Sequence, residues 1–150
     1  MGLENEFVVR LAVAAILGSL LGFERSLAGK HAGMRTYSMV SLGSCLFVVI
    51  GTLSSLQLSL LFSAINPIQI AASVVIGIGF IGAGLSAMRG EHPELTTASG
   101  IWVAAGVGMA AGFGFYTVAI SSVIIGLIVF LVFAKFERLM NERYGVKHEA

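Results

Sequence analysis

The chain has 150 residues, of which 11% are charged and 57% are hydrophobic, and its mean hydropathy is +0.93. Because soluble domains carry about 25% charged residues, this composition excludes a soluble protein and is typical of a chain whose solvent is mostly lipid. The formal net charge of +1 gives no reason to expect a nucleic-acid partner, and a single cysteine, Cys45, cannot build a disulfide framework or a paired-thiolate metal site.

Five segments are predicted to cross a membrane as helices, since about 20 apolar residues span the hydrocarbon core and about 17 suffice at the short end. The segments are 7–23, 36–56, 68–88, 96–112 and 115–134. Charged clusters at 24–35 and 89–94, the Asn66-Pro67 pair and the "GFG" at 112–114 separate them. The sequence therefore predicts an all-α membrane protein with five transmembrane helices.

The positions of the basic residues predict the orientation. If the amino terminus lies outside, eight of the nine Lys and Arg residues face the cytoplasm, and only Arg10 stays near the outer face. We therefore predict an N-out, C-in topology, with Arg10 reaching outward as an interfacial anchor. Residues 135–150 are expected to follow a transmembrane domain of residues 1–134 as a short amphipathic cytoplasmic tail, next to lipid head groups or, alternatively, a partner protein.

The first residues, "MGLENEF", contain two glutamates and no basic residue, so we expect the first span to be retained rather than cleaved as a signal peptide. Further along, a shift of 61 residues aligns two predicted cytoplasmic hairpins, "GKHAGMRTYS" at 29–38 and "GEHPELTTAS" at 90–99. This predicts a parallel internal repeat of helices 1–2 and 3–4, related by an axis along the membrane normal. Chance similarity among common membrane residues is the alternative.

Glycine motifs recur in three of the predicted spans. The stretch "GIGFIGAG" at 77–84 has the G-x-G-x-x-G spacing of a dinucleotide-binding turn, but it lies inside an apolar span with no acidic residue about 20 positions on. We therefore interpret the small residues as walls of close helix contacts, which either are fixed or let helices slide. They are Gly18 and Gly22; Gly79, Gly82, Ala83 and Ser86; and Gly100, Ala104, Gly108 and Gly112.

Glu24 and Arg25 end the first span, and Arg35 opens the second. Ionisable groups at membrane depth are functional candidates, because placing one there unpaired costs several kcal/mol. Since neighbouring residues point about 100° apart on a helix, Glu24 is placed to pair with Arg35 across the hairpin. This pair is interpreted either as a structural clamp or as part of a ligand site.

Thr36, and Thr96 or Thr97, stand where the second and fourth helices begin and are predicted to cap free amide groups. With Arg25, Arg35 and Arg89 nearby, these helix ends form a positive face suited to a carboxylate, a phosphate or an anionic lipid head group.

Other polar and aromatic residues carry weaker signals. His31 and His92 have no second ligand at i+3 or i+4, which argues against a transition-metal site. Trp102 is expected to serve in packing. The chain has no aspartate and no apparent nucleophile and base pair, so we do not expect an enzyme.

Three stretches together resemble the MgtC/SapB family of bacterial inner-membrane proteins: "GFERSLAGKHAGMRTYSMVSLGSCLF" (22–47), "GIGFIGAG" (77–84) and "LTTASGIWVAAGVGMAAGFGFYTVAI" (95–120). The resemblance covers about residues 8–134 and implies the family's membrane domain standing alone in the inner membrane. It also implies links to magnesium limitation, to virulence and to restraint of the F-type ATP synthase. The residues that match the family's motifs are Glu24, Arg25, Gly33, Arg35, Thr36, Thr96, Thr97 and Trp102.

The sequence departs from the family pattern at four positions. Asn66 and Gln69 stand where many members have an acidic residue and an arginine, Tyr37 replaces a common histidine, and Glu94 replaces a glycine. The first departure removes an external acidic group that could bind a cation.

Three functions follow as hypotheses. The first is magnesium-linked transport or homeostasis of a small ion, with Mg²⁺ as the ligand of a site made by Glu24, Arg35 and the threonine-capped helix ends, and with no other cofactor. The second is a non-transporting regulator that uses its glycine seams to bind another membrane complex, such as the F-type ATP synthase. The third is binding of an anionic lipid or metabolite. Faces of small residues also suggest a homodimer, the alternative being that these faces are used in contacts within the chain.

Overall fold

The computed structural model describes residues 3–58, 66–87 and 95–144, and within these residues every regular element is a helix. The helices are α1 (Leu3–Leu27), α2 (Met34–Leu58), α3 (Pro67–Ala87), α4 (Leu95–Gly112) and α5 (Tyr116–Tyr144). Each is long and apolar enough to cross a membrane. The predicted all-helical fold with five spans is therefore confirmed.

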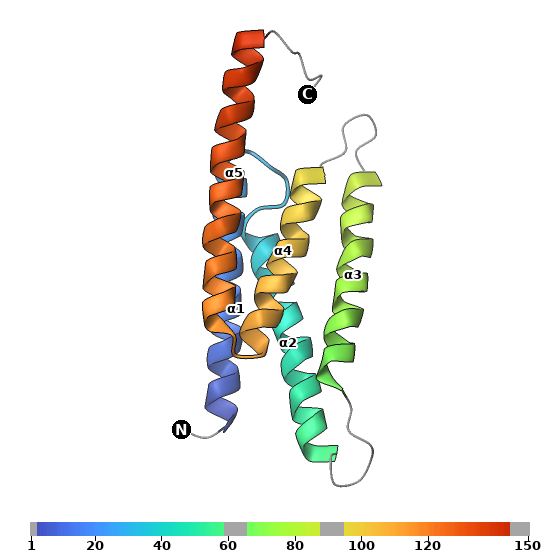
Figure 1. The fold of residues 1–150 in the computed structure, drawn as a ribbon. Helices are drawn as coiled ribbons and strands as arrows, with labels where there is room; N and C mark the ends of the chain where they lie inside the picture. Colours follow the sequence, from blue (N-terminus) through green and yellow to red (C-terminus); the bar gives the residue numbers. More distant parts are fainter. Residues whose placement is uncertain (1–2, 59–65, 88–94, 145–150) are drawn as a thin grey trace.

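Successive helices run in opposite directions, and α4 lies at the centre of the bundle (Figure 1). It contacts each of the other helices, whereas α3 contacts only α2 and α4. As a result, the end of α1, the starts of α2 and α4 and the end of α5 meet at one end of the molecule. We call this the basic end, because Arg25, Lys30, Arg35 and the charged part of α5 lie there, while Arg10 lies near the opposite end. The side of the membrane that the basic end faces stays a prediction, and Arg89 and Lys147 lie outside the described residues.

The first glycine seam joins α1 to α2. A Cβ atom added at Gly18 would lie 2.6 Å from the carbonyl oxygen of Tyr37, and one added at Gly22 would lie 2.7 Å from the Cα atom of Met34. The two backbones are therefore close enough that only hydrogen fits between them. Such close approach gains dispersion contacts where lipid offers no hydrophobic drive.

The second seam joins α4 to α2. A Cβ atom at Gly108 would overlap the backbone carbonyl group of Ser41, and one at Gly112 would lie 2.8 Å from Cβ of Val48. On its other side Ser41 donates its hydroxyl to the Ala14 carbonyl at 2.8 Å, so α2 is held between α1 and α4. Gly18, Gly22, Gly108 and Gly112 therefore all lie where two helices approach closely.

The predicted tight wall on α3 is wrong. An added Cβ at Gly79 would have nothing within 4 Å, and at Gly82 it would make only an ordinary contact, 3.6 Å from Cβ of Ala98. Ala83 is exposed. The physical reason is that α3 lies at the edge of the bundle (Figure 1) and packs through larger side chains, Val74, Ile78 and Leu85. Gly18 and its counterpart Gly79 are thus packed differently, and the internal repeat itself stays a prediction.

Arg10 points inward rather than outward, which corrects the expected anchor. Helix α4 ends in a Schellman motif, with Gly114 at a φ of +81° and the Phe115 amide donating to the Ala110 carbonyl at 2.8 Å. This motif leaves the Gly112 carbonyl free, and Nη1 of Arg10 donates to it at 2.7 Å. Arg10 also forms an ion pair with Glu6. The side chain therefore ties α1 to the α4–α5 turn.

We expect Arg10→Gln to lower the free energy of unfolding by about 2 kcal/mol, the scale of a hydrogen bond from a charged group. Unfolding of the purified protein in detergent micelles, followed by heat or denaturant, measures the change. The matched control is Glu6→Gln, which removes the same exposed ion pair but leaves the bond to Gly112, and should cost under about 0.5 kcal/mol. Equal losses in the two variants would mean that the Gly112 bond contributes nothing.

Candidate functional site

A groove of about 1530 Å³ runs between α1, α4 and α5, from the basic end along α5 as far as Ser122. Polar and apolar residues both line it, and we call it the polar groove after its polar residues. Helix α5 has 29 residues, which makes it about 43 Å long, longer than the hydrocarbon core of about 30 Å. Its charged end therefore projects past α4 and forms one wall (Figure 1). The polar residues that line the groove are Glu24, Arg25, Lys30, Thr96, Ser99, Ser122, Glu137, Arg138, Asn141 and Glu142.

At the closed side of this groove, Arg25 is buried, with 4% of its surface exposed. Its Nε atom forms an ion pair with Oε2 of Glu24, and its Cζ atom lies 3.8 Å from the centroid of the Phe130 ring on α5. A guanidinium group so placed is stabilised by both the carboxylate and the ring face. The expected pairing of Glu24 with Arg35 is therefore wrong. The long side chains of adjacent residues bend toward each other at the end of α1, and Arg35 is exposed on α2.

Tyr37 supports this cluster from α2. Its ring is fully buried, and its hydroxyl donates to the Thr97 carbonyl on α4 at 3.3 Å. A Cβ atom at Gly100 would overlap the Tyr37 hydroxyl and lie 2.8 Å from Cζ of Phe130. Gly100 thus lies against both Tyr37 and Phe130, so the ring of Phe130 is contacted by Arg25 of α1 and by α4.

The structure does not bring Thr36 to this site. The amide of Met34, at the start of α2, is capped by Oγ of Ser26 on α1, at 3.1 Å, so the predicted cap from Thr36 is wrong. Ser26 can take this role because the α1–α2 hairpin places it beside the start of α2, whereas Thr36 lies two residues inside the helix. Thr36 is exposed and lines a different groove, between α2 and α3.

The three predicted site residues on α4, Thr96, Thr97 and Trp102, lie in three different environments. Thr96 lines the polar groove, Thr97 is buried, and both lie inside the first turn, because α4 begins at Leu95. The residue before that start, Glu94, lies outside the described residues, so a threonine cap on α4 stays a prediction. Trp102 is 55% exposed and lines a smaller hollow of about 370 Å³ between α3 and α4. The expectation that Trp102 serves in core packing is therefore wrong. Trp102 does not line the polar groove either.

Sequence reasoning missed Tyr37 and Phe130 as parts of the site. A signal for Tyr37 was available, because Tyr37, Ser41 and Ser44 follow i, i+4, i+7 spacing and mark one polar stripe on an apolar helix. All three are buried. Phe130 had no such signal, since it is one of many apolar residues in its span.

The donor set of the groove decides which ions it suits. Within the described ranges no group of three or more His, Cys, Asp or Glu side chains is close enough to hold a metal ion. Glu24, Glu137 and Glu142 nevertheless line one groove with Lys30 and Arg138. Such an open, mixed-charge space favours a hydrated ion or a polar head group over a dehydrated metal held in a closed cage.

Comparison with known proteins gives a consistent result. A family model described as "MgtC family" matches residues 11–139. The chain is 42% identical over 145 residues to "Putative magnesium transporter YhiD" of Escherichia coli (strain K12), covering 95% of this chain and 67% of that protein. It is 34% identical over 137 residues to "Protein MgtC" of Salmonella typhimurium (strain LT2), covering 91% of this chain and 56% of that protein.

A third relative, "Protein SapB" of Bacillus subtilis (strain 168), is 30% identical over 129 residues, covering 84% of this chain and 56% of that protein. No solved structure matches the chain. The chain thus spans about two thirds of YhiD and just over half of MgtC and SapB.

Proposed function

The chain belongs to the MgtC family, and we propose that it takes part in magnesium-linked ion transport or homeostasis in the bacterial inner membrane. The family match and the five membrane-length helices make it a multi-pass membrane protein. The observation that carries the proposal is the polar groove at the basic end, where Glu24 faces the same space as two carboxylates of α5. The name of YhiD refers to magnesium transport in that protein, which supports this choice of ion.

The chemistry of Mg²⁺ fits an open groove. This ion keeps several waters and usually takes one or two carboxylate ligands, so it needs space as well as charge. A groove of about 1530 Å³ provides the space, and Glu24 lies at its closed side. Because Arg25 already neutralises Glu24, we propose that Mg²⁺ competes with Arg25 for this carboxylate. Release of Arg25 would then be the step by which the ion is passed on or sensed.

Magnesium flux into liposomes tests this function. With the purified protein reconstituted and a magnesium-sensitive dye inside the vesicles, we expect flux above that of empty vesicles. We expect Glu24→Gln to lower it about tenfold or more, the scale seen when support for a metal site is removed. The control is Glu6→Gln, which removes an exposed carboxylate near the opposite end and should leave flux unchanged. Flux no higher than in empty vesicles, or equal loss in both variants, would contradict the proposal.

A second function is favoured by the packing of the described residues. Leu21, Tyr37 and Ile101 are fully buried and fill the centre of the bundle, while α3 leaves Ile68 and Ile76 mostly exposed. A regulator that moves no solute would use this free face of α3 to bind another membrane complex, such as the F-type ATP synthase, or a second copy of the chain. Absence of flux from vesicles, together with a membrane complex retained during purification, would favour this function.

The third function, binding of an anionic lipid or metabolite at the basic end, has less support. Arg25 is the most deeply placed cation of the groove, and its charge is balanced by Glu24. Lys30 and Arg138 remain to attract an anion, and both are exposed.

A further inference from the structure

Arg25 is held in the polar groove by two contacts of different kinds. Its Nε atom pairs with Oε2 of Glu24, and its Cζ atom lies 3.8 Å from the centroid of the Phe130 ring. Glu24 and Arg25 are neighbours on α1, and their side chains leave the helix about 100° apart. Phe130 approaches from α5. Of the two partners of Arg25, the ring is therefore the one that comes from another helix.

The backbone of Arg25 is fixed by the turn that ends α1. The Lys30 amide donates to the Arg25 carbonyl at 3.0 Å, and Gly29 has a φ of +69°, so the helix closes in a Schellman motif. Helix α1 does not have to unwind for Arg25 to leave Glu24. Exchange at this carboxylate therefore requires rotation of the Arg25 side chain, away from the carboxylate and off the ring.

The Phe130 ring is positioned by packing within the bundle. It is half-buried and packs against the buried core cluster that contains Tyr37. A Cβ atom added at Gly100 would lie 2.8 Å from Cζ of Phe130, so α4 passes close to the tip of the ring. Tyr37, on the other side of Gly100, is tied to the Thr97 carbonyl by a hydrogen bond of 3.3 Å. The ring that faces Arg25 thus belongs to the packed centre of the protein.

The balance of charges at Glu24 leaves the ring a deciding part. The side chains of Arg25 and Glu24 are 5% and 13% exposed, and at such burial the attraction between two charges is largely offset by their loss of water. The ring face adds an attraction for the guanidinium group. This attraction favours Arg25 alone, because it is lost when Mg²⁺ takes the carboxylate and Arg25 turns away.

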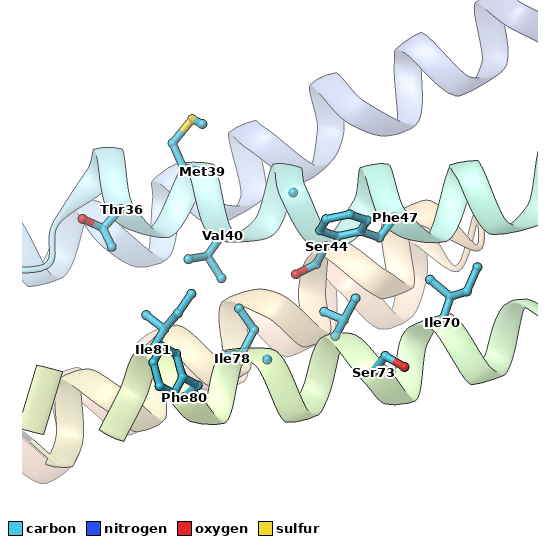
Figure 2. A pocket seen from close by; sticks show the side chains of 13 residues that line it. Thr36, Met39, Val40, Ser44, Phe47, Ile70, Ser73, Ile78, Phe80 and Ile81 are labelled. Atoms are coloured by element: carbon cyan, nitrogen blue, oxygen red, sulfur yellow. The ribbon is translucent and has the colours of Figure 1, made fainter. Parts of the chain in front are cut away.

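The groove between α2 and α3 has a different character. Apolar and hydroxyl side chains line it, and no charged residue of the described ranges does so (Figure 2). A cation that entered it would find no opposite charge. Exchange of one cation for another is therefore expected in the polar groove, where Glu24, Arg25 and Phe130 all line the same space.

We propose that Phe130 is the positioning residue that sets the magnesium concentration at which Arg25 releases Glu24. This inference rests on the proposed function, since it concerns the same carboxylate. Phe130 itself touches no ion. It keeps Arg25 on Glu24 at low magnesium, and Mg²⁺ takes the carboxylate when its concentration is high enough to displace a guanidinium group that both partners hold. The site thus responds to a rise in magnesium rather than binding the ion at any concentration.

Titration of the full chain with magnesium chloride in detergent micelles, at constant ionic strength, tests this role. The readout is the NMR signal of the Arg25 Nε–H group, identified by its loss in Arg25→Lys. The signal should change position as Mg²⁺ releases Arg25 from Glu24. In Phe130→Leu the midpoint of this change should fall about 5- to 30-fold in magnesium concentration, the scale of a cation–π contact shielded from water. A role in packing alone would not raise the affinity for an ion.

Two further variants separate the ring face from its bulk. Phe136→Leu is the matched control, because it makes the same change on α5 at an exposed residue that does not line the polar groove, and it should leave the midpoint unchanged. A difluorophenylalanine in place of Phe130, with both fluorines at the meta positions, nearly keeps the shape of the ring but weakens its negative face. It should also lower the midpoint, although the packing is retained.

An unchanged or higher midpoint in Phe130→Leu would overturn the proposal. An Arg25 signal that does not respond to Mg²⁺ in either protein would also overturn it. The flux measurement decides the proposed function separately. Flux without a response of the Arg25 signal would support transport and contradict the role of Phe130. A lower midpoint in Phe130→Leu without any flux would support the role of Phe130 and contradict transport.

Discussion

Replacing Gly108 with leucine is expected to cost about 3 kcal/mol or more of the free energy of unfolding, enough to prevent assembly of the bundle. A Cβ atom at this position would overlap the carbonyl oxygen of Ser41 and lie 2.7 Å from its carbonyl carbon. These are backbone atoms, which cannot rotate aside as a side chain can. Helix α4 contacts each of the other helices, so a shift at Gly108 would disturb them all. Unfolding in detergent micelles measures the effect.

The matched control is Gly106→Leu, two residues earlier on the same helix. A Cβ atom there meets nothing within 4 Å, and leucine favours a helix over glycine by up to about 1 kcal/mol. This variant should therefore be as stable as the unmodified chain or more stable. If both leucine variants unfolded equally, helix composition rather than the α2–α4 seam would be the cause.

If Gly108→Leu disrupts the fold, substitutions at the glycines of α4 cannot be used to test the binding of a partner protein. Gly108 and Gly112 already contact α2 within the same chain. If a leucine variant at either position lost a partner protein, the loss would reflect a disrupted fold. Gly84 on α3 has open space around it. Partner binding is therefore better tested on α3.

The second large effect is expected at Arg25. Arg25→Ala should lower the free energy of unfolding by about 3 kcal/mol, because breaking a buried ion pair leaves the other charge without compensation. The carboxylate of Glu24 would stay largely buried without its partner, and the contact with the Phe130 ring would be lost. Arg25→Lys keeps the charge but not the flat guanidinium group, and we expect about half the loss. Thermal unfolding in micelles measures both variants.

Lys30→Ala is the control for Arg25. Lys30 lines the same groove and carries the same charge, but it is exposed, so the change should stay within about 0.5 kcal/mol. If Arg25→Ala were as stable as this control, the pair with Glu24 would contribute nothing to folding. Combining Arg25→Ala with Phe130→Leu should give less than the sum of the two losses, because the residues are in contact.

The lengths and order of the spans could be predicted because hydropathy reports directly which residues tolerate lipid. The second span was predicted at 36–56, and α2 runs over Met34–Leu58. The fifth differs more: it was predicted to end at residue 134, and α5 continues to Tyr144. Hydropathy marks where the hydrocarbon ends, while a helix continues until a residue breaks it, and residues 135–144 contain no proline or glycine.

The sequence by itself determined the five spans, the gathering of basic residues at one end and the spacing of small residues along the helix faces, because these depend on composition and on spacing along one helix. Only the tertiary structure decided which glycines are in contact, which residue pairs with Glu24 and which helix stays at the edge. The contact of Arg25 with Phe130, the cap from Ser26 and the bond from Arg10 to Gly112 join residues on different helices or turns. Such contacts depend on how each helix is rotated and tilted against the others. The spacing of residues within one span does not specify which helices pack against it or at what rotation.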